Sequence, residues 1–385
     1  MILRNLHSIT EDRVIDVRIT GEKIIAVEDS NVMAPDAKLT LDFNNAIVFP
    51  GLINSHDHLD FNLFPQLGNR IYNNYVAWSH DIQKVNREEI DKVLKIPKPL
   101  RIRWGIYKNL LSGVTTVVNH GAKLEVTNDL INVFQNCYSL HSILLEKHWK
   151  RRLLKPFRNS WPFAIHIGEG TDDKARKEID TFIKWNLFKR KTIGIHGVAM
   201  NAEQARAFDA LVWCPDSNYF LLGKTANIVA LKKNTRILFG TDSTVSANWN
   251  IWEHLRAARK ENALNDNELF NALTIDAAAV WGLDRVGRIE AGYEADVVIA
   301  KRKEDLSDMN AFYALAPADI LVVIKRGAIK LFDTSLQEQL NAAGMDLGGY
   351  SKISIDGSEK YVWGNLPQLM ADVKQYNPDA NFPVE

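Results

Sequence analysis

Apolar and polar positions alternate along the first fifty residues, which is the pattern of strands that bury one face and expose the other. The alternating runs are Arg13–Ile19, Lys23–Val27, Leu39–Phe43 and Ala46–Phe49. Thr20-Gly21-Glu22 separates the first two runs and indicates a hairpin, and Pro50-Gly51 ends the last run. We therefore predict a strand-rich N-terminal segment.

From Leu52 onward the pattern changes to short apolar runs separated by stretches with helical periodicity. Seven runs are predicted strands: Leu52–Asn54, Val114–Asn119, Leu140–Leu145, Phe163–Ile167, Thr192–Ile195, Ala210–Trp213 and Arg236–Phe239. Strands that alternate with helices form parallel sheets or barrels, so this α/β region is predicted to be a TIM-type (β/α)8 barrel, regular or distorted. A barrel needs an eighth strand, and we place the unrecognised one between Glu146 and Trp161.

Strand and turn patterns return after Trp281. Gly287–Gly292 indicates a pair of turns, Ala295–Ala300 and Ile320–Lys325 are predicted strands, and Arg326-Gly327-Ala328 closes a hairpin. We expect these strands to pair with those of the N-terminal segment.

The domain prediction follows from these three regions. Residues 1–50 and 286–346 would form a small composite β-sandwich, residues 51–285 the barrel, and residues 347–385 a C-terminal extension of mixed character. The pattern of the last segment predicts no single place for it in the fold.

The charge and the cysteine content of the chain limit the classes of protein to which it can belong. The 385-residue chain is 46% hydrophobic and 24% charged, with 47 basic and 47 acidic residues. Zero net charge argues against a general binder of nucleic acid or membrane surfaces. Cys137 and Cys214 form no pattern, which suits a reducing cytoplasm, and no apolar run is long enough to span a bilayer. We expect a cytoplasmic protein that acts on a small molecule. The sequence leaves open whether the protein forms a homo-oligomer.

Histidines and one aspartate stand where the predicted strands end. His56-Asp57-His58 follows the first barrel run, and residues two apart on a strand point to the same side, so both imidazoles can bind one metal ion. His166, His196 and Asp242 stand at the ends of three later strands. Barrel enzymes take their catalytic residues from such ends, and imidazoles with one carboxylate suit Zn²⁺ or Fe²⁺.

Six segments resemble one known family and follow its order along the chain. They are Val48–Leu59, Ser112–Val118, His166–Glu169, Trp213–Asn218, Phe239–Ser243 and Gly287–Asp296. They resemble the first-strand HxH signature, the second-strand pattern, the HxxE, CPxSN and GTDS motifs, and the return into the β-sandwich of the amidohydrolase superfamily. HxxE is typical of its mononuclear branch, which includes cytosine, guanine and S-adenosylhomocysteine deaminases and chlorohydrolase-type enzymes.

The resemblance implies a role for each matched polar residue. The ligands of one divalent ion, Zn²⁺ or alternatively Fe²⁺, would be His56, His58, His166 and Asp242. Glu169 would carry protons between the nucleophile, the substrate and the leaving group. His196 would hydrogen-bond the metal-bound water or the developing oxyanion, and Asp242 would share in catalysis. The amino group of the substrate is a poor leaving group unless its nitrogen is protonated, so an acid must stand beside the nucleophile.

Weaker signals mark candidate substrate contacts. These are Asp60, Gln66, His120, Ser217 and Asn218. Asp60 and Gln66 match no substrate-specific signature, and His120 either lines the pocket or lies at the surface. His141 and His254 lie within periodic segments and are interpreted as packing or surface residues.

The segment between Leu145 and Phe163 is short for the mononuclear branch. Binuclear branches place a bridging Lys or Glu at the end of the fourth strand, a position that Glu146 or Lys147 could fill. The HxxE motif favours one ion. The basic run 147–158 is interpreted as a solvated face, with recognition of an anion or a neighbouring subunit as the alternative.

The predicted function is deamination of a small amino-substituted heterocycle through metal-activated hydroxide. One alternative is cleavage of another C–N bond, in an amide or lactam, on the same scaffold. The other is a non-catalytic assembly protein, which the complete ligand set and Glu169 disfavour. Loops decide the substrate on such scaffolds, so the sequence does not identify it.

Overall fold

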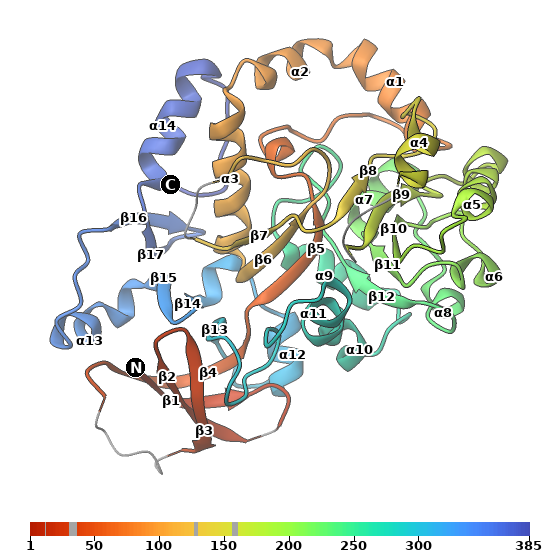
Figure 1. Cartoon of the computed structure of the whole chain (residues 1–385). Coiled ribbons are helices and arrows are strands. Elements are labelled where there is room, and N and C mark those ends of the chain that lie inside the picture. The colour runs from red at the N-terminus through yellow and green to blue at the C-terminus, as the bar shows by residue number, and fades with distance from the viewer. Residues whose placement is uncertain (12, 31–36, 127–129, 156–160) are drawn as a thin grey trace.

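The two ends of the chain meet in one nine-stranded sheet, with the order β16-β17-β15-β14-β13-β4-β1-β2-β3 (Figure 1). The computed structural model describes residues 1–11, 13–30, 37–126, 130–155 and 161–385. The strands of this sheet are β1 Ile2–Ser8, β2 Val14–Thr20, β3 Lys23–Asp29, β4 Thr40–Pro50, β13 Val297–Lys301, β14 Ile320–Lys325, β15 Ala328–Asp333, β16 Tyr350–Ile355 and β17 Ser358–Trp363. β4 and β13 join the two chain ends by antiparallel pairing, with Val297 opposite Pro50.

The strand predictions for both ends are largely confirmed. β2 and β3 form the expected hairpin, with Thr20 opposite Lys23, and β14 pairs with β15 across the turn at Arg326-Gly327. β1 is an additional strand that the pattern did not single out, and β16 and β17 bring the C-terminal segment into the same sheet. The described residues show one sheet here rather than two stacked sheets, so the sandwich and the domain boundaries stay predictions.

The centre of the molecule consists of two parallel sheets, ordered β12-β11-β10-β9-β8 and β5-β6-β7. Their strands are β5 Leu52–Asp57, β6 Val114–Asn119, β7 Asn132–Phe134, β8 Tyr138–Leu140, β9 Phe163–Ile167, β10 Thr192–His196, β11 Ala210–Trp213 and β12 Arg236–Phe239. Five of these strands are completely buried, and they are mainly apolar apart from polar residues that gather toward their carboxyl ends, as expected for parallel strands covered by helices. The expected alternation of parallel strands and helices is therefore confirmed.

The two parallel sheets approach each other beside His56. The backbone N–H groups of Thr241 and Asp242 donate to the carbonyl oxygen of His56 at 3.1 and 3.0 Å. Gly240 allows this approach, because a Cβ on it would lie 2.7 Å from the Cβ of His56. On the other side, β7 and β8 form no ladder among the described residues, so a closed barrel stays a prediction.

Two strand predictions are wrong in position. The expected strand Leu140–Leu145 is β8, which ends at Leu140 and is followed by turns. The strand expected between Glu146 and Trp161 is replaced by the helix Trp149–Leu154, with residues 156–160 outside the described part of the chain. The unrecognised strand is β7 instead, since three residues are too few to show a period.

Helices surround the parallel strands and cover one end of them (Figure 1). They are α1 Tyr75–Val85, α2 Arg87–Leu94, α3 Lys98–Leu111, α4 Trp149–Leu154, α5 Asp173–Trp185, α6 Ala202–Ala205, α7 Pro215–Leu222, α8 Ile228–Leu231, α9 Ile251–Lys260, α10 Asp266–Asn271, α11 Ile275–Trp281, α12 Asp308–Tyr313, α13 Gln337–Ala342 and α14 Leu366–Tyr376. A short 3-10 helix, η1 Leu59–Phe61, directly follows the HxH segment. α5 illustrates how these helices form. The side chain of Asp172 caps its N-terminus, and its apolar face, with Ala175, Ile179 and Phe182, is buried.

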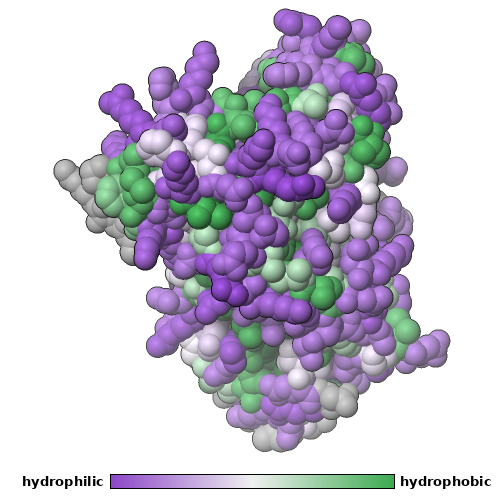
Figure 2. Space-filling view, turned by 90° about the vertical axis from the view of Figure 1, so that its right-hand side faces the viewer, coloured by the Kyte–Doolittle hydropathy of each residue, from purple (hydrophilic) through white to green (hydrophobic). Residues whose placement is uncertain are grey.

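The surface is mostly hydrophilic on the face shown in Figure 2, where hydrophobic side chains gather in small patches. Among the described helices, none is long and apolar enough to cross a bilayer. The main apolar core lies between the central strands and the surrounding helices, and a second apolar cluster packs on the strands contributed by the two chain ends.

Candidate metal centre

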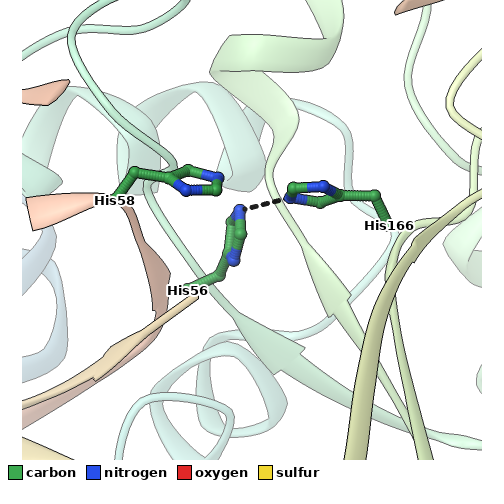
Figure 3. Close-up of side chains that lie close together, drawn as sticks. All are labelled: His56, His58 and His166. Atoms are coloured by element: carbon green, nitrogen blue, oxygen red, sulfur yellow. Dashed lines mark hydrogen bonds between the residues drawn. The ribbon is translucent and has the colours of Figure 1, made fainter. Parts of the chain in front are cut away.

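His56 and His58 stand at the carboxyl end of β5 and point toward the same space. Their ring centroids lie 4.9 Å apart, His56 is fully buried and His58 is 9% exposed. His166, on β9, faces them from the other parallel sheet, with its Nε2 3.2 Å from the Nε2 of His56 (Figure 3). Three imidazoles from two sheets therefore converge, as the strand-end argument predicts.

Asp242 supplies a carboxylate to the same space from the end of β12. Its Oδ1 lies 3.6 Å from the Nε2 of His56 and 3.7 Å from the Nε2 of His58. Its backbone has a φ of 58°, which is unusual for a residue with a side chain and is held by the hydrogen bond to the carbonyl of His56. The chain therefore adopts an unfavourable backbone conformation where it presents this carboxylate.

The spacing of these four groups fits a divalent ion. Ligand bonds of about 2.0–2.1 Å in a tetrahedral shell put neighbouring ligand atoms roughly 3.4 Å apart. The measured separations of 3.2, 3.6 and 3.7 Å between donor atoms bracket that value. Two sets of three residues have all donor atoms within 4.8 Å of one another: His56, His58 and His166, and His56, His196 and Asp242.

Protonation of the cluster also suits metal binding. Burial lowers the pKa of His58 to about 4 and puts that of His166 well below its ordinary value, with neighbouring imidazoles adding to the effect. Burial alone would raise the pKa of Asp242, but hydrogen bonding and charge from His56, with other histidines, hold it well below its ordinary value. Neutral imidazoles and an ionised carboxylate are the forms that bind metal ions.

Ser217 is bonded to Asp242. The Asp242 Oδ2 atom accepts from the Oγ atoms of Ser217 at 2.8 Å and Ser246 at 3.0 Å, while Oδ1 accepts from the backbone N–H of Ser243. Ser217 is fully buried. In this geometry the two hydroxyls orient the carboxylate of Asp242. The contact of Ser217 with substrate stays a prediction.

Asn218 holds the ring of His196. The indole N–H of Trp213 donates to the Thr225 hydroxyl at 2.7 Å, and that hydroxyl donates to the Asn218 Oδ1 at 3.3 Å. An indole N–H can only donate, so the Thr225 hydroxyl accepts from Trp213 and donates its own proton to the Asn218 Oδ1. The NH₂ group of Asn218 then lies on the other side, 2.9 Å from the Nδ1 of His196, and donates to it. Neutral His196 therefore carries its proton on Nε2, which faces the metal cluster.

Glu169 stands beside His196, with its Oε2 3.6 Å from the His196 Nε2. It is 5% exposed and lies outside both groups of potential metal ligands. Burial, together with the nearby carboxylates of Asp242 and Glu178, raises the pKa of Glu169 well above its ordinary value. A carboxyl group that holds its proton more readily than an exposed glutamate therefore adjoins the cluster.

Two further histidines belong to the same cluster. His120 is buried, its ring lies 4.4 Å from that of His166, and Ser139 lies within hydrogen-bonding distance of its ring. His141 follows β8, lines the cavity at the cluster and has its ring 4.8 Å from that of His166. His141 is exposed, as its interpretation as a surface residue allows, but its place in the cavity lining was not expected, because the residue follows the end of β8 instead of lying within a strand.

Asp60 and Gln66 are not brought into the cavity lining. Asp60 pairs with Lys98 at 3.3 Å, and Gln66 is exposed. Their predicted contact with substrate therefore has no geometric support, whereas His166, Glu169, His196 and Asp242 all line the cavity.

The position that would make the site binuclear is otherwise engaged. Glu146 accepts from the backbone N–H of His141 at 2.6 Å and pairs with Arg152, and Lys147 is exposed. Among the described residues, Glu146 does not belong to a group of potential metal ligands. In the described part of the basic run, Lys150 stacks over the ring of Trp185.

The sequence of this chain is similar to those of known proteins. The sequence profile of the Amidohydrolase family matches residues 157–330. The chain is 23% identical to a guanine deaminase from Pongo abelii, in a match that covers 62% of this chain but only 55% of that relative. It is 24% identical to a 5-methylthioadenosine/S-adenosylhomocysteine deaminase from Caldanaerobacter subterraneus subsp. tengcongensis, covering 84% of this chain and 91% of the relative.

The fold is likewise shared with a solved structure. An adenosine deaminase from Xanthomonas campestris with bound zinc superposes with a TM-score of 0.73 at 17% identity, over 98% of this chain and 97% of that chain. At this identity the likeness concerns the mixed α/β fold. The profile match, these relatives and the shared fold agree that the chain is similar to proteins of the amidohydrolase family, as the order of its motifs suggests.

Proposed function

We propose that this protein is a metal-dependent aminohydrolase that deaminates a small amino-substituted heterocycle. The placement of Glu169 carries the proposal. It is a buried carboxyl group beside His196, outside the ligand groups, with a raised pKa. Release of ammonia from a ring carbon requires such a proton donor within reach of the nucleophile and the leaving group.

The metal would be held by His56, His58, His166 and Asp242, with Zn²⁺ as the first choice and Fe²⁺ as the alternative. When bound, such an ion lowers the pKa of a water molecule so that it serves as a nucleophile near neutral pH. Glu146 and Lys147 are engaged elsewhere or exposed, which supports one ion per chain.

The chain's own residues would handle the protons. Glu169 would accept a proton from the nucleophile, pass it to the substrate ring nitrogen and deliver a proton to the departing amino group. His196, with its proton on Nε2, would donate a hydrogen bond to the oxygen that becomes the product carbonyl. The serines would keep the Asp242 carboxylate in place. Overall, water and the C–NH₂ group become C=O and ammonia.

The relatives support this chemistry, since the similar proteins are named as deaminases of guanine, of 5-methylthioadenosine and S-adenosylhomocysteine, and of adenosine. We further propose that the two parallel sheets close into a (β/α)8 barrel. The contact of β12 with β5 supports closure on one side. The same reasoning assigns residues 51–285 to the barrel and the joined chain ends to a separate unit.

A screen for ammonia release tests the proposal. Purified protein loaded with Zn²⁺ or Fe²⁺ is incubated with aminopurines, aminopyrimidines, aminotriazines and pterins, and with amides and lactams as a comparison set. Release of ammonia from a heterocycle by the wild type, with loss in Glu169→Gln, is expected. Turnover of only amides or lactams would overturn deamination in favour of the alternative C–N hydrolysis.

A further inference from the structure

The candidate metal centre forms one end of a cavity of about 240 Å³. At this end lie the polar side chains His58, His141, His166, Glu169, His196 and Asp242. A helical wall of the cavity comes mainly from η1, α1 and α2, with Phe61, Tyr75, Trp78, Ile82, Ile90 and Leu94, and the Phe61 ring stacks on that of His58. A substrate that presents its reacting carbon to the metal would therefore place the rest of itself along this wall.

The aromatic residues of the wall have their polar atoms engaged within the protein. The Tyr75 hydroxyl donates to Glu178 at 2.9 Å, and the Trp78 indole N–H donates to the carbonyl oxygen of Leu67 at 2.7 Å. These groups are not free to bind a polar substituent. The wall therefore presents ring and aliphatic surface, which favours apolar groups.

Charge is confined to the metal end of the cavity. None of the described lining residues is a lysine or arginine, and the only carboxylates are Glu169 and Asp242. The remaining polar residues of the helical wall, Ser79 and Gln83, are neutral. A charged substituent buried against this wall would lose its hydration without gaining a partner.

The exposed part of the cavity lining combines three apolar side chains with the polar side chains of Gln83 and His141. Phe61, Leu94 and Leu145 line the cavity and are 38%, 51% and 39% exposed. Exposed apolar residues that adjoin a pocket commonly mark a ligand-binding surface. Lys92, the cation of α2 nearest in sequence to Leu94, pairs with Glu88 and Asp379 and is not part of the lining.

We infer that the substrate is an amino-heterocycle with an uncharged, mainly apolar substituent that lies along α1 and α2, and that phosphorylated or carboxylated analogues are poor substrates. The inference rests on the proposed deamination and specifies its substrate class. The metal end recognises the amino-bearing ring carbon, and the helical wall recognises the substituent.

Matched substrates test the inference. One aminopurine is compared in three forms: unsubstituted, with a butyl group, and with a carboxypropyl group at the same position. Each buried methylene is worth about fourfold in affinity, so kcat/KM for the butyl form is expected to exceed that of the other two by at least tenfold, as an order of magnitude. Equal or better turnover of the carboxypropyl form would overturn the inference while leaving deamination intact. No ammonia from any form, nor from the wider screen, would overturn the proposed function itself.

A pair of variants tests whether the substituent of the substrate lies along this wall. Leu94→Lys places a cation at the rim, and Val85→Lys places the same cation at the end of α1, where Val85 is 57% exposed and outside the lining. Both positions are exposed, so folding should be retained, which circular dichroism checks. Leu94→Lys should shift the kcat/KM ratio of the carboxypropyl to the butyl form upward by about tenfold or more, whereas Val85→Lys should leave it unchanged. The same ratio in both variants would show that the substituent does not lie at this wall.

Discussion

Asn218 and His196 are joined by a hydrogen bond of 2.9 Å between the Asn218 Nδ2 and the His196 Nδ1. His196 ends β10 with a φ of 71°, and its ring is buried, so this contact governs the state of a strained residue at the site. The direction of the bond depends on Thr225 and Trp213, neither of which touches the metal cluster directly. Residues behind the site thereby decide which nitrogen of His196 faces the substrate.

Replacement of Thr225 with valine should weaken that control. The variant keeps the shape but leaves the Trp213 N–H and the Asn218 amide without their partner, so kcat should fall on the order of tenfold. ¹⁵N NMR of the imidazole nitrogens should show a mixture of His196 tautomers in place of the Nε2–H form. Thr225→Ser retains the hydroxyl and should behave as wild type. An unchanged tautomer signal in Thr225→Val would remove the relay from the mechanism.

The Glu169→Gln substitution should separate catalysis from metal binding. The amide preserves shape but carries no titratable proton, so turnover should fall by about a hundred- to ten-thousandfold while the metal stays bound. Metal content is measured by elemental analysis alongside kcat. Glu203→Gln, at an exposed position of α6, is the matched control and should change neither quantity. Loss of metal in Glu169→Gln would instead make Glu169 a ligand.

Removal of a ligand should abolish metal retention. Purified protein should hold close to one divalent ion per chain, and His56→Ala or Asp242→Ala should lose most of it, because the remaining donors no longer enclose the ion. His80→Ala, an exposed histidine on α1, serves as the control and should retain it. Chelation should lower the melting temperature of the wild type, since a bound ion stabilises only the folded state. Two ions per chain would favour a binuclear site.

The buried ion pair between Asp57 and Lys108 should contribute to the stability of the HxH segment. The Lys108 Nζ lies 3.2 Å from the Asp57 Oδ2 and 2.9 Å from the Asn62 Oδ1, and both charged side chains are at most 2% exposed. Lys108→Met leaves a buried carboxylate unpaired and should lower the free energy of unfolding by about 3–5 kcal/mol, measured in urea.

Lys92→Met is the control for that measurement, because Lys92 forms surface ion pairs whose loss should lower the free energy of unfolding far less than loss of the buried pair. The double variant Asp57→Asn with Lys108→Met should recover part of the loss, since no buried charge then lacks its partner. Equal effects of Lys108→Met and Lys92→Met would contradict a stabilising role for the buried pair.

Features that depend on neighbouring positions along the chain could be read from the sequence. The i, i+2 spacing of His56 and His58 puts both on one side of β5, and His166 and Asp242 follow from the rule that such residues stand at strand ends. The strand runs themselves were recognised by composition, because parallel strands buried on both faces are almost wholly apolar.

Features that depend on packing between distant segments required the tertiary structure. β7 is three residues long and carries no period, so it was not recognised, and the strand expected at Leu140–Leu145 ends at Leu140, directly before His141. Ser217 and Asn218 were singled out as substrate contacts, yet their hydrogen bonds go to Asp242 and His196, more than twenty residues away in sequence. Asp60 and Gln66, close to the HxH segment in sequence, are not part of the cavity lining, to which α1 and α2 contribute, and Asp60 pairs with Lys98. Spacing along a strand determines which ligands can meet, whereas the partner of each remaining polar group depends on which segments pack around it.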